Sequence, residues 1–205
     1  MKKKILTILL IAAMGLMAAS CGKKADNKGG STGGSSNDAS TSASTQKEYS
    51  PGSHDGSLYT NEFFGISMTL GDFIPYTDEQ IKQLAEQSGA TSSTTYDFVA
   101  VSSDNSANVN VVSEKLTKLA AMNDAEEILK SQAGLVEKQL ATYNASVSMT
   151  EVKFCGKTHP AMLVAADGFT EVMVCLKQGD YAGYITATAS DQAGAQAVLD
   201  MFTAL

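Results

Sequence analysis

Arginine is absent from this chain, and all 15 of its basic residues are lysines. Arginine is the side chain best suited to bidentate recognition of phosphates and carboxylates, so its absence argues against a nucleotide-binding protein. Residues 58–205 contain eight lysines and 18 acidic residues. A region with this excess of negative charge repels nucleic acid and anionic lipid head groups, so we expect neither as its partner.

Proline is scarce as well, with Pro51, Pro75 and Pro160 as the only examples, so long regular helices and strands can form. The first 57 of the 205 residues lack the pattern of a globular region. Residues 58–205 have the size of one ordinary domain, large enough for a single core. The sequence therefore predicts three parts: a signal peptide at 1–20, a lipidated cysteine with a tether at 21–57, and one domain at 58–205.

Residues 1–20 have the features of a bacterial signal peptide. Lys2, Lys3 and Lys4 precede an apolar run at residues 5–19 that only Thr7 interrupts. As a helix this run would be roughly 22 Å long, short of the roughly 30 Å hydrocarbon core of a membrane. We therefore expect a leader that is removed, not a permanent membrane span.

The leader ends in Ala18-Ala19-Ser20-Cys21-Gly22, which resembles the lipobox of bacterial lipoproteins. Ala18 departs from the strongest form of the motif, which has leucine there. The resemblance implies that diacylglycerol is attached to Cys21 and that a signal peptidase cuts before it. Two or three acyl chains would hold the protein stably on the extracytoplasmic face of the cell membrane. The alternative is an ordinary secretory signal cut nearby, with Cys21 incidental.

Residues 22–57 are rich in glycine, serine and threonine and include the run Gly29-Gly30-Ser31-Thr32-Gly33-Gly34. They show no apolar periodicity, and their four lysines balance their four acids. This composition predicts a flexible spacer with a reach of about 30–36 Å. His54 falls in this stretch and is expected to be a solvated linker residue.

Local patterns predict helices and strands in residues 58–205. Residues 58–61 and 64–70 have the composition of a strand pair, and Thr77-Asp78-Glu79-Gln80 is a capping-box pattern that begins a helix. Residues 95–102 and 108–116 are expected strands, and a long helix begins at Asn123-Asp124. Its apolar stripe is Ala125, Ile128, Leu129, Val136, Leu140 and Tyr143.

Four strands are expected next, at about 147–155, 159–166, 169–177 and 181–189, with tight turns between them. The chain is expected to end in a helix with Ala197, Val198, Met201, Phe202 and Leu205 facing the core. Tight turns imply an antiparallel sheet with helices packed on it, so the predicted fold class is α+β, an α/β/α sandwich.

This order of elements resembles the PsbP-like fold, shared by the photosystem II extrinsic protein and small Ran-binding proteins. The resemblance is carried by the first strand pair, with Tyr59-x-Asn61 and Phe64-Gly65-Ile66, by the long middle helix, and by Gly179-Asp180-Tyr181 leading into Ile185-Thr186-Ala187-Thr188. The family implies a noncatalytic binding or assembly-factor role, and it has no catalytic or cofactor-binding residues to transfer.

Cysteine and histidine are too few to define a reactive centre. Cys155 and His159 could supply a nucleophile or half of a metal site, but no further ligand lies nearby in sequence, so we expect a hairpin with an exposed His159. Cys155 and Cys175 are expected to be small buried thiols. A disulfide between them stays open, although two strand spacings of roughly 9–10 Å would exceed the reach of a bridge.

Two further features have the composition of a binding site. Asp104-Asn105-Ser106-Ala107-Asn108 is rich in oxygen but lacks the spaced acids of a calcium loop, so a plain turn is expected. Most of the aromatic residues near the start of the domain are expected in the core, with a few lining a groove beside the first hairpin where a partner could dock. They are Tyr59, Phe63, Phe64, Phe73, Tyr76 and Tyr96.

The sequence as a whole predicts a lipid-anchored, noncatalytic binding module with no metal or cofactor, whose partner is another envelope protein or envelope component. A small solute receptor is the first alternative, although 148 residues is little for two lobes around a cleft. An envelope hydrolase is the second, and the single histidine of the domain argues against it.

Overall fold

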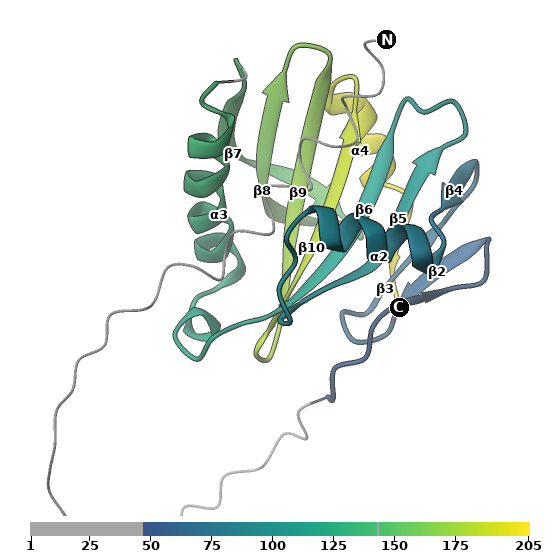
Figure 1. Cartoon of the computed structure of the whole chain (residues 1–205), viewed down its shortest axis with the longest axis horizontal. Coiled ribbons are helices and arrows are strands. Elements are labelled where there is room, and N and C mark those ends of the chain that lie inside the picture. Colours follow the sequence, from purple (N-terminus) through teal and green to yellow (C-terminus); the bar gives the residue numbers. More distant parts are fainter. Residues whose placement is uncertain (1–46, 143) are drawn as a thin grey trace, which may run out of the picture.

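The computed structural model describes residues 47–142 and 144–205, and within them the chain forms two antiparallel β-sheets and three α-helices (Figure 1). The leader, Cys21 and most of the tether lie outside the described residues. No helix in the described part is long and apolar enough to cross a membrane. The smaller sheet has four strands in the order β1-β2-β3-β11: Ser53–His54, Leu58–Asn61, Ile66–Thr69 and Phe202–Ala204.

The larger sheet has seven strands in the order β4-β5-β6-β10-β9-β8-β7, and every neighbouring pair is antiparallel. Alternating β-branched and apolar residues with tight turns between them favour this meander. The strands are β4 Phe73–Pro75, β5 Thr94–Ser102, β6 Asn108–Lys115, β7 Ser146–Phe154, β8 Lys157–Ala166, β9 Phe169–Gln178 and β10 Tyr181–Ala189.

The helices begin where the sequence provides capping residues. Helix α2 (Asp78–Gln87) has a complete capping box from Thr77 and Gln80, and α3 (Ala125–Leu140) has one from Asp124 and Glu127. Each of these side chains accepts a hydrogen bond from an otherwise unpaired backbone N–H at the start of the helix. Helix α4 (Gln192–Leu199) is capped by Asp191, and a short 3-10 helix, η2 (Ala120–Met122), precedes α3.

The seven-stranded sheet has a buried core on each face. We call the side covered by the small sheet and α4 the inner face, and the side covered by α2 and α3 the outer face. Tyr59, Phe98 and Leu199 belong to the inner core, whereas Leu129, Met173 and Tyr184 belong to the outer one. Helices thus lie on both faces of an antiparallel sheet, which confirms the predicted α+β sandwich (Figure 1).

The last predicted helix is shorter than expected, and three of its expected core residues are not in the core. One of them, Ala197, is exposed because the buried side of α4 is formed by Ala195, Val198 and Leu199. Helix α4 ends at Leu199, and Phe202–Ala204 form β11 instead, paired with Met68, Ser67 and Ile66 of β3. Phe202 is buried, but Leu205 is 65% exposed and Met201 is only partly buried. The unpaired edge of β3 offers hydrogen bonds to these residues, and this tertiary contact outweighs the helical periodicity.

Candidate functional site

An irregularity in β5 creates the polar centre of the candidate site. The register between β5 and β6 shifts between Tyr96 and Phe98, so that Asp97 is an extra residue in the strand. Tyr96 therefore packs in the outer core and Phe98 in the inner core, although only one residue separates them. A bulge of this kind turns a side chain in a direction that a regular strand would not allow. The bulge places the Asp97 carboxylate within hydrogen-bond distance of the side chains of Asn61 on β2 and Ser113 on β6.

The buried Asp97 carboxylate accepts hydrogen bonds from four donors. The amide of Asn61 reaches Oδ2 at 3.0 Å, the hydroxyl of Ser113 reaches the same oxygen at 2.5 Å, and the hydroxyl of Tyr49 reaches Oδ1 at 2.9 Å. The backbone N–H of Gly52 is the fourth donor. Burial raises the pKa of Asp97, while the four donors act in the opposite direction and stabilise the ionised form.

Two of these donors belong to residues 47–55, which we call the strap. Sequence reasoning placed the strap in the tether, but here it packs on the domain. The Tyr49 ring stacks on Tyr181 with centroids 4.3 Å apart and planes 9° apart, and it meets the edge of Phe63 at 5.2 Å. Burial raises the pKa of Tyr49 to about 12, so its hydroxyl keeps the proton that it donates to Asp97.

The rest of the strap is held by backbone contacts at the small sheet. Gly52 lies so close to the ring of the buried Tyr59 that an added Cβ would come within 2.4 Å of the Tyr59 hydroxyl oxygen. Ser53 and His54 pair with Thr60 and Tyr59 as strand β1. His54, expected to be a solvated linker residue, is exposed but belongs to this strand. Only glycine fits at position 52 without moving Tyr59.

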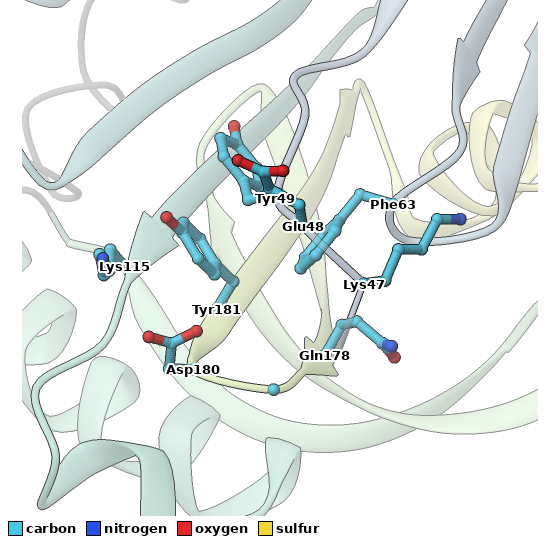
Figure 2. Close-up of a pocket in the computed structure, with 9 residues that line it drawn as sticks. Lys47, Glu48, Tyr49, Phe63, Lys115, Gln178, Asp180 and Tyr181 are labelled. Atoms are coloured by element: carbon cyan, nitrogen blue, oxygen red, sulfur yellow. The ribbon is translucent and has the colours of Figure 1, made fainter. Parts of the chain in front are cut away.

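An open pocket of about 400 Å³ lies where the strap meets the turn between β9 and β10 (Figure 2). Its lining residues come from the strap, the first hairpin, the end of β6 and this turn: Lys47, Glu48, Tyr49, Phe63, Lys115, Gln178, Gly179, Asp180 and Tyr181. Gly179 has a φ of 59° and so permits the tight turn that carries Asp180 and Tyr181 into the wall.

Aromatic rings form the wall of the pocket and charged side chains form its rim. Figure 2 shows Tyr181 between Tyr49 on one side and Lys115 on the other, and the Lys115 ammonium lies 5.8 Å from the Tyr181 ring centroid. The Lys47 ammonium donates to the backbone carbonyl of Glu62. Two lysines and two acids at the rim balance in charge, so the pocket suits a ligand with an apolar part and dispersed polar groups rather than a strongly charged ion.

The structure places Cys155 and Cys175 on opposite faces of the seven-stranded sheet. Cys155 lies in the β7–β8 turn against the inner core, and Cys175 lies in the outer core, and both are free thiols. Cys155 is only partly buried, which corrects the expectation of two buried thiols: it occupies a turn position with a φ of 49°. Burial raises the pKa of the Cys155 thiol and lowers that of His159, and the first of these shifts disfavours a thiolate. His159 was expected to be exposed, but it is half-buried in β8, where it pairs with Val152.

The loop at Asp104 is a turn, as expected. Oδ1 of Asp104 accepts from the hydroxyl of Ser102 at 2.8 Å and from the backbone N–H of Ser106 at 2.9 Å. Hydrogen bonds from the side chain and backbone of Ser106, together with that from Ser102, lower the pKa of Asp104 to about 2. Its oxygens are thus used inside the turn. Among residues 47–142 and 144–205, no group of three or more His, Cys, Asp and Glu side chains is placed to hold a metal ion.

The expected aromatic groove beside the first hairpin corresponds only in part to the pocket. Tyr59, Phe63, Phe73 and Tyr96 are buried, and of the six aromatic residues considered only Phe63 lines the pocket. Tyr49 and Tyr181 were missed as site residues. The signal for Tyr49 was present, because it is a lone aromatic residue in a stretch dominated by glycine and serine.

Comparison with known proteins gives structural similarity but no family. No protein-family model and no curated protein matches the chain. The solution structure of cyanobacterial PsbP (CyanoP) from Synechocystis sp. PCC 6803 is similar over 77% of this chain and 98% of that one, with 10% identity and a TM-score of 0.46. A crystal structure from Bacteroides thetaiotaomicron VPI-5482 is similar over 74% of this chain and 49% of that one, with 13% identity and a TM-score of 0.40. Both TM-scores are below 0.5, so the fold class stated above rests on the strands and helices of this chain alone.

Proposed function

We propose that this chain is an extracytoplasmic lipoprotein, anchored in the cell membrane through Cys21, whose domain binds another envelope protein or envelope component without catalysing a reaction. The leader, the lipobox-like segment and the neutral spacer support the anchored location. The resemblance of the sequence to PsbP-like proteins, carried by Tyr59-x-Asn61 and Gly179-Asp180-Tyr181, supports a binding or assembly role.

The pocket at the strap is the observation that carries the binding role. Tyr49, Phe63 and Tyr181 pack against one another in its wall, while Glu48 and Gln178 at the rim are exposed. Aromatic residues surrounded by exposed polar ones are the usual composition of a protein-recognition site. The position also suits a partner, because the pocket lies at the point where the tether joins the domain.

A small solute receptor is the second candidate function, and the size of the pocket favours it. A volume of about 400 Å³ falls within the range of small-molecule sites. The two candidates differ in a simple measurement. A small solute added to the purified protein would raise its melting temperature in a concentration-dependent way. A protein partner would instead be recovered by cross-linking on intact cells.

The anchor is tested by replacing the proposed lipid-attachment residue. Cells expressing the wild-type chain and the Cys21→Ser variant would be grown with radiolabelled palmitate and fractionated. We expect label and membrane association for the wild type, and neither for Cys21→Ser. Cys155→Ser is the matched control and should behave as the wild type. Equal membrane association of all three chains would overturn the lipid anchor.

The binding role is tested by photo-cross-linking on intact cells. A photoreactive amino acid at Gln178, on the pocket rim, is compared with the same residue at Lys82, an exposed position on α2. We expect a reproducible cross-linked species from position 178 and none from position 82. The same species from both positions, or no species from position 178, would overturn binding of a protein at this pocket.

A further inference from the structure

The pocket is a joint structure of the strap and the domain. Three of its nine lining residues, Lys47, Glu48 and Tyr49, belong to the strap, and Tyr49 also covers one face of Tyr181. The other six lie in the first hairpin, at the end of β6 and around the β9–β10 turn. Without the strap, the pocket would lose one wall, and the Tyr49-facing side of Tyr181 would meet solvent.

The strap is held by a small set of side-chain contacts and one short strand pair. Among them, Tyr49 meets the edge of Phe63 and the His54 ring lies 5.6 Å from that of Phe98. Tyr49 stacks on Tyr181 and donates to Asp97, Gly52 donates its backbone N–H to Asp97, and two residues of β1 pair with β2. Lys47 adds a bond to the carbonyl of Glu62. The strands behind the strap are joined along their whole lengths, as in the nine paired positions between β9 and β10. A segment with so few contacts opens at lower free energy than the sheet beneath it.

Asp97 keeps two of its four hydrogen-bond donors when the strap leaves. Asn61 and Ser113, which belong to β2 and β6, still donate to the carboxylate when Tyr49 and Gly52 leave. Water can take the places of the two lost donors, because departure of the strap opens the site to solvent. Asp97 therefore keeps hydrogen-bond donors in both states, and undocking of the strap does not require unfolding of the sheet.

We propose that the strap is a docking element that couples the tether to the pocket: the pocket is complete only while the strap is docked, so ligand binding holds the strap down and a pull on the tether weakens binding. This inference rests on the binding function proposed above. The coupling is reciprocal, because any ligand that needs the docked strap must stabilise it by the same factor by which docking raises its affinity.

The direction of the chain makes the coupling sensitive to force. The tether enters the strap at residue 47, so a pull from the membrane acts first on Lys47 and Tyr49 and reaches β1 only afterwards. Tyr49 is the side chain that closes the pocket and holds Asp97. A lipid-anchored domain whose partner moves away would thus lose its pocket before it loses its fold.

Undocking is tested by nitration of Tyr181 in the purified full-length chain, which needs no ligand. Gly52→Ala should expel the strap, because its Cβ would collide with Tyr59, although residue 52 neither lines the pocket nor contributes a side chain to Asp97. We expect nitration of Tyr181 to rise at least fivefold, with Tyr76, a partly buried residue beside α2, unchanged as the internal reference. Ser50→Ala, an exposed strap position, is the matched control and should match the wild type.

Hydrogen exchange on the same samples distinguishes undocking from unfolding. We expect at least tenfold faster exchange in peptides covering residues 53–60 of Gly52→Ala, and unchanged exchange in β9 and β10. Tyr49→Phe, which keeps the ring but removes the hydroxyl, should show a smaller acceleration in the same peptides. Unchanged Tyr181 nitration in Gly52→Ala, or faster exchange throughout the sheet, would overturn an independently docking strap.

Coupling to binding is tested with the cross-linker at Gln178 on intact cells. Gly52→Ala should lower the yield of the cross-linked species at least fivefold, and Ser50→Ala should leave it unchanged. An unchanged yield in Gly52→Ala, despite faster strap exchange, would overturn the coupling while the binding function survives. Absence of any cross-linked species in the wild type would instead defeat the binding function and the coupling with it, and the nitration result would still decide whether the strap docks.

Discussion

Two buried carboxylates in the seven-stranded sheet differ strongly in the number of hydrogen bonds that they accept. Asp97, at the bulge in β5, has four hydrogen-bond donors, two of which come from the strap. Glu171, in β9 on the outer face, is fully buried, and its Oε2 accepts one hydrogen bond, from Thr188 at 3.2 Å. Its other oxygen, Oε1, has no partner among the described residues.

The difference shows what each acid is suited for. Burial raises the pKa of both acids, but the four donors around Asp97 oppose that shift and stabilise its carboxylate, which in turn holds the strap in place. Burial raises the pKa of Glu171 to about 8, so at neutral pH it is mainly a neutral carboxylic acid. Glu171 therefore lowers stability whenever it ionises, whereas Asp97 anchors the strap when it is ionised.

The largest expected effect is the pH dependence of stability caused by Glu171. Its pKa in the folded chain, about 8, lies above the value of 4.5 expected when unfolded, so its contribution is fully present below pH 4.5 and is lost as the pH rises through 8. Between pH 5 and pH 9 the wild type should lose roughly 4 kcal/mol more than Glu171→Gln, which cannot ionise. Urea unfolding of both chains at pH 5, 7 and 9 measures this difference.

Other titrating groups contribute equally to both chains and cancel in that comparison. The control is Glu151→Gln, an exposed position on β7, which should keep the pH profile of the wild type. If Glu171→Gln and the wild type had parallel profiles, Glu171 would not be a neutral acid in the folded protein.

Removal of Asp97 should have the next largest effect. Asp97→Ala leaves the donors of Asn61, Ser113 and Tyr49 without their acceptor, and we expect it to lower the free energy of unfolding by about 3 kcal/mol. Asp97→Asn keeps one acceptor oxygen and should cost about half as much. Urea denaturation at pH 7 measures both. Equal losses for the two variants would mean that packing, and not hydrogen bonding, makes the residue important.

A substitution in the strap should lower stability less than removal of Asp97, the acid that holds it. Tyr49→Phe keeps both ring contacts and loses only the hydroxyl bond to Asp97, so we expect a loss of about 1 kcal/mol in strap docking. Hydrogen exchange of residues 53–60 reports this local free energy directly. A loss as large as that of Asp97→Ala would contradict the view that Asp97 stays satisfied after the strap leaves.

Much of the fold follows from local sequence patterns, because they act over a few residues. The capping residues Thr77 and Asp124 and the turns at Gly156, Gly168 and Gly179 mark the ends of the helices and the β7–β10 strands. The short strands β1, β4 and β11 were not predicted. Two to three residues carry too little pattern, and each exists because a neighbouring strand has an unpaired edge.

The site was harder to predict than the fold, for a physical reason that Asp97 illustrates. Alternation along Thr95–Ser102 would place Tyr96 and Phe98 on one face, but the bulge sends them to opposite faces and turns Asp97 toward β2. Nothing in the local sequence marks a bulge. Glu171 did leave a signal, since it alternates with Phe169 and Met173 and so shares their buried face.

The smallest expected effect comes from Thr186, which lies on β10 next to the strand of Glu171. Its hydroxyl is buried and has no partner among the described residues, as is true of Oε1 of Glu171. Thr186→Val replaces the hydroxyl by a methyl group of similar shape and removes the cost of an unpaired polar group, so we expect about 1 kcal/mol of added stability. Ser113→Ala should do the opposite, because that hydroxyl donates to Asp97. Urea denaturation at pH 7 compares the two variants. A loss of stability in Thr186→Val would mean that this hydroxyl bonds to Glu171 or to a buried water. Glu171 and Asp97 would then differ less in their hydrogen bonding than the contacts described above indicate.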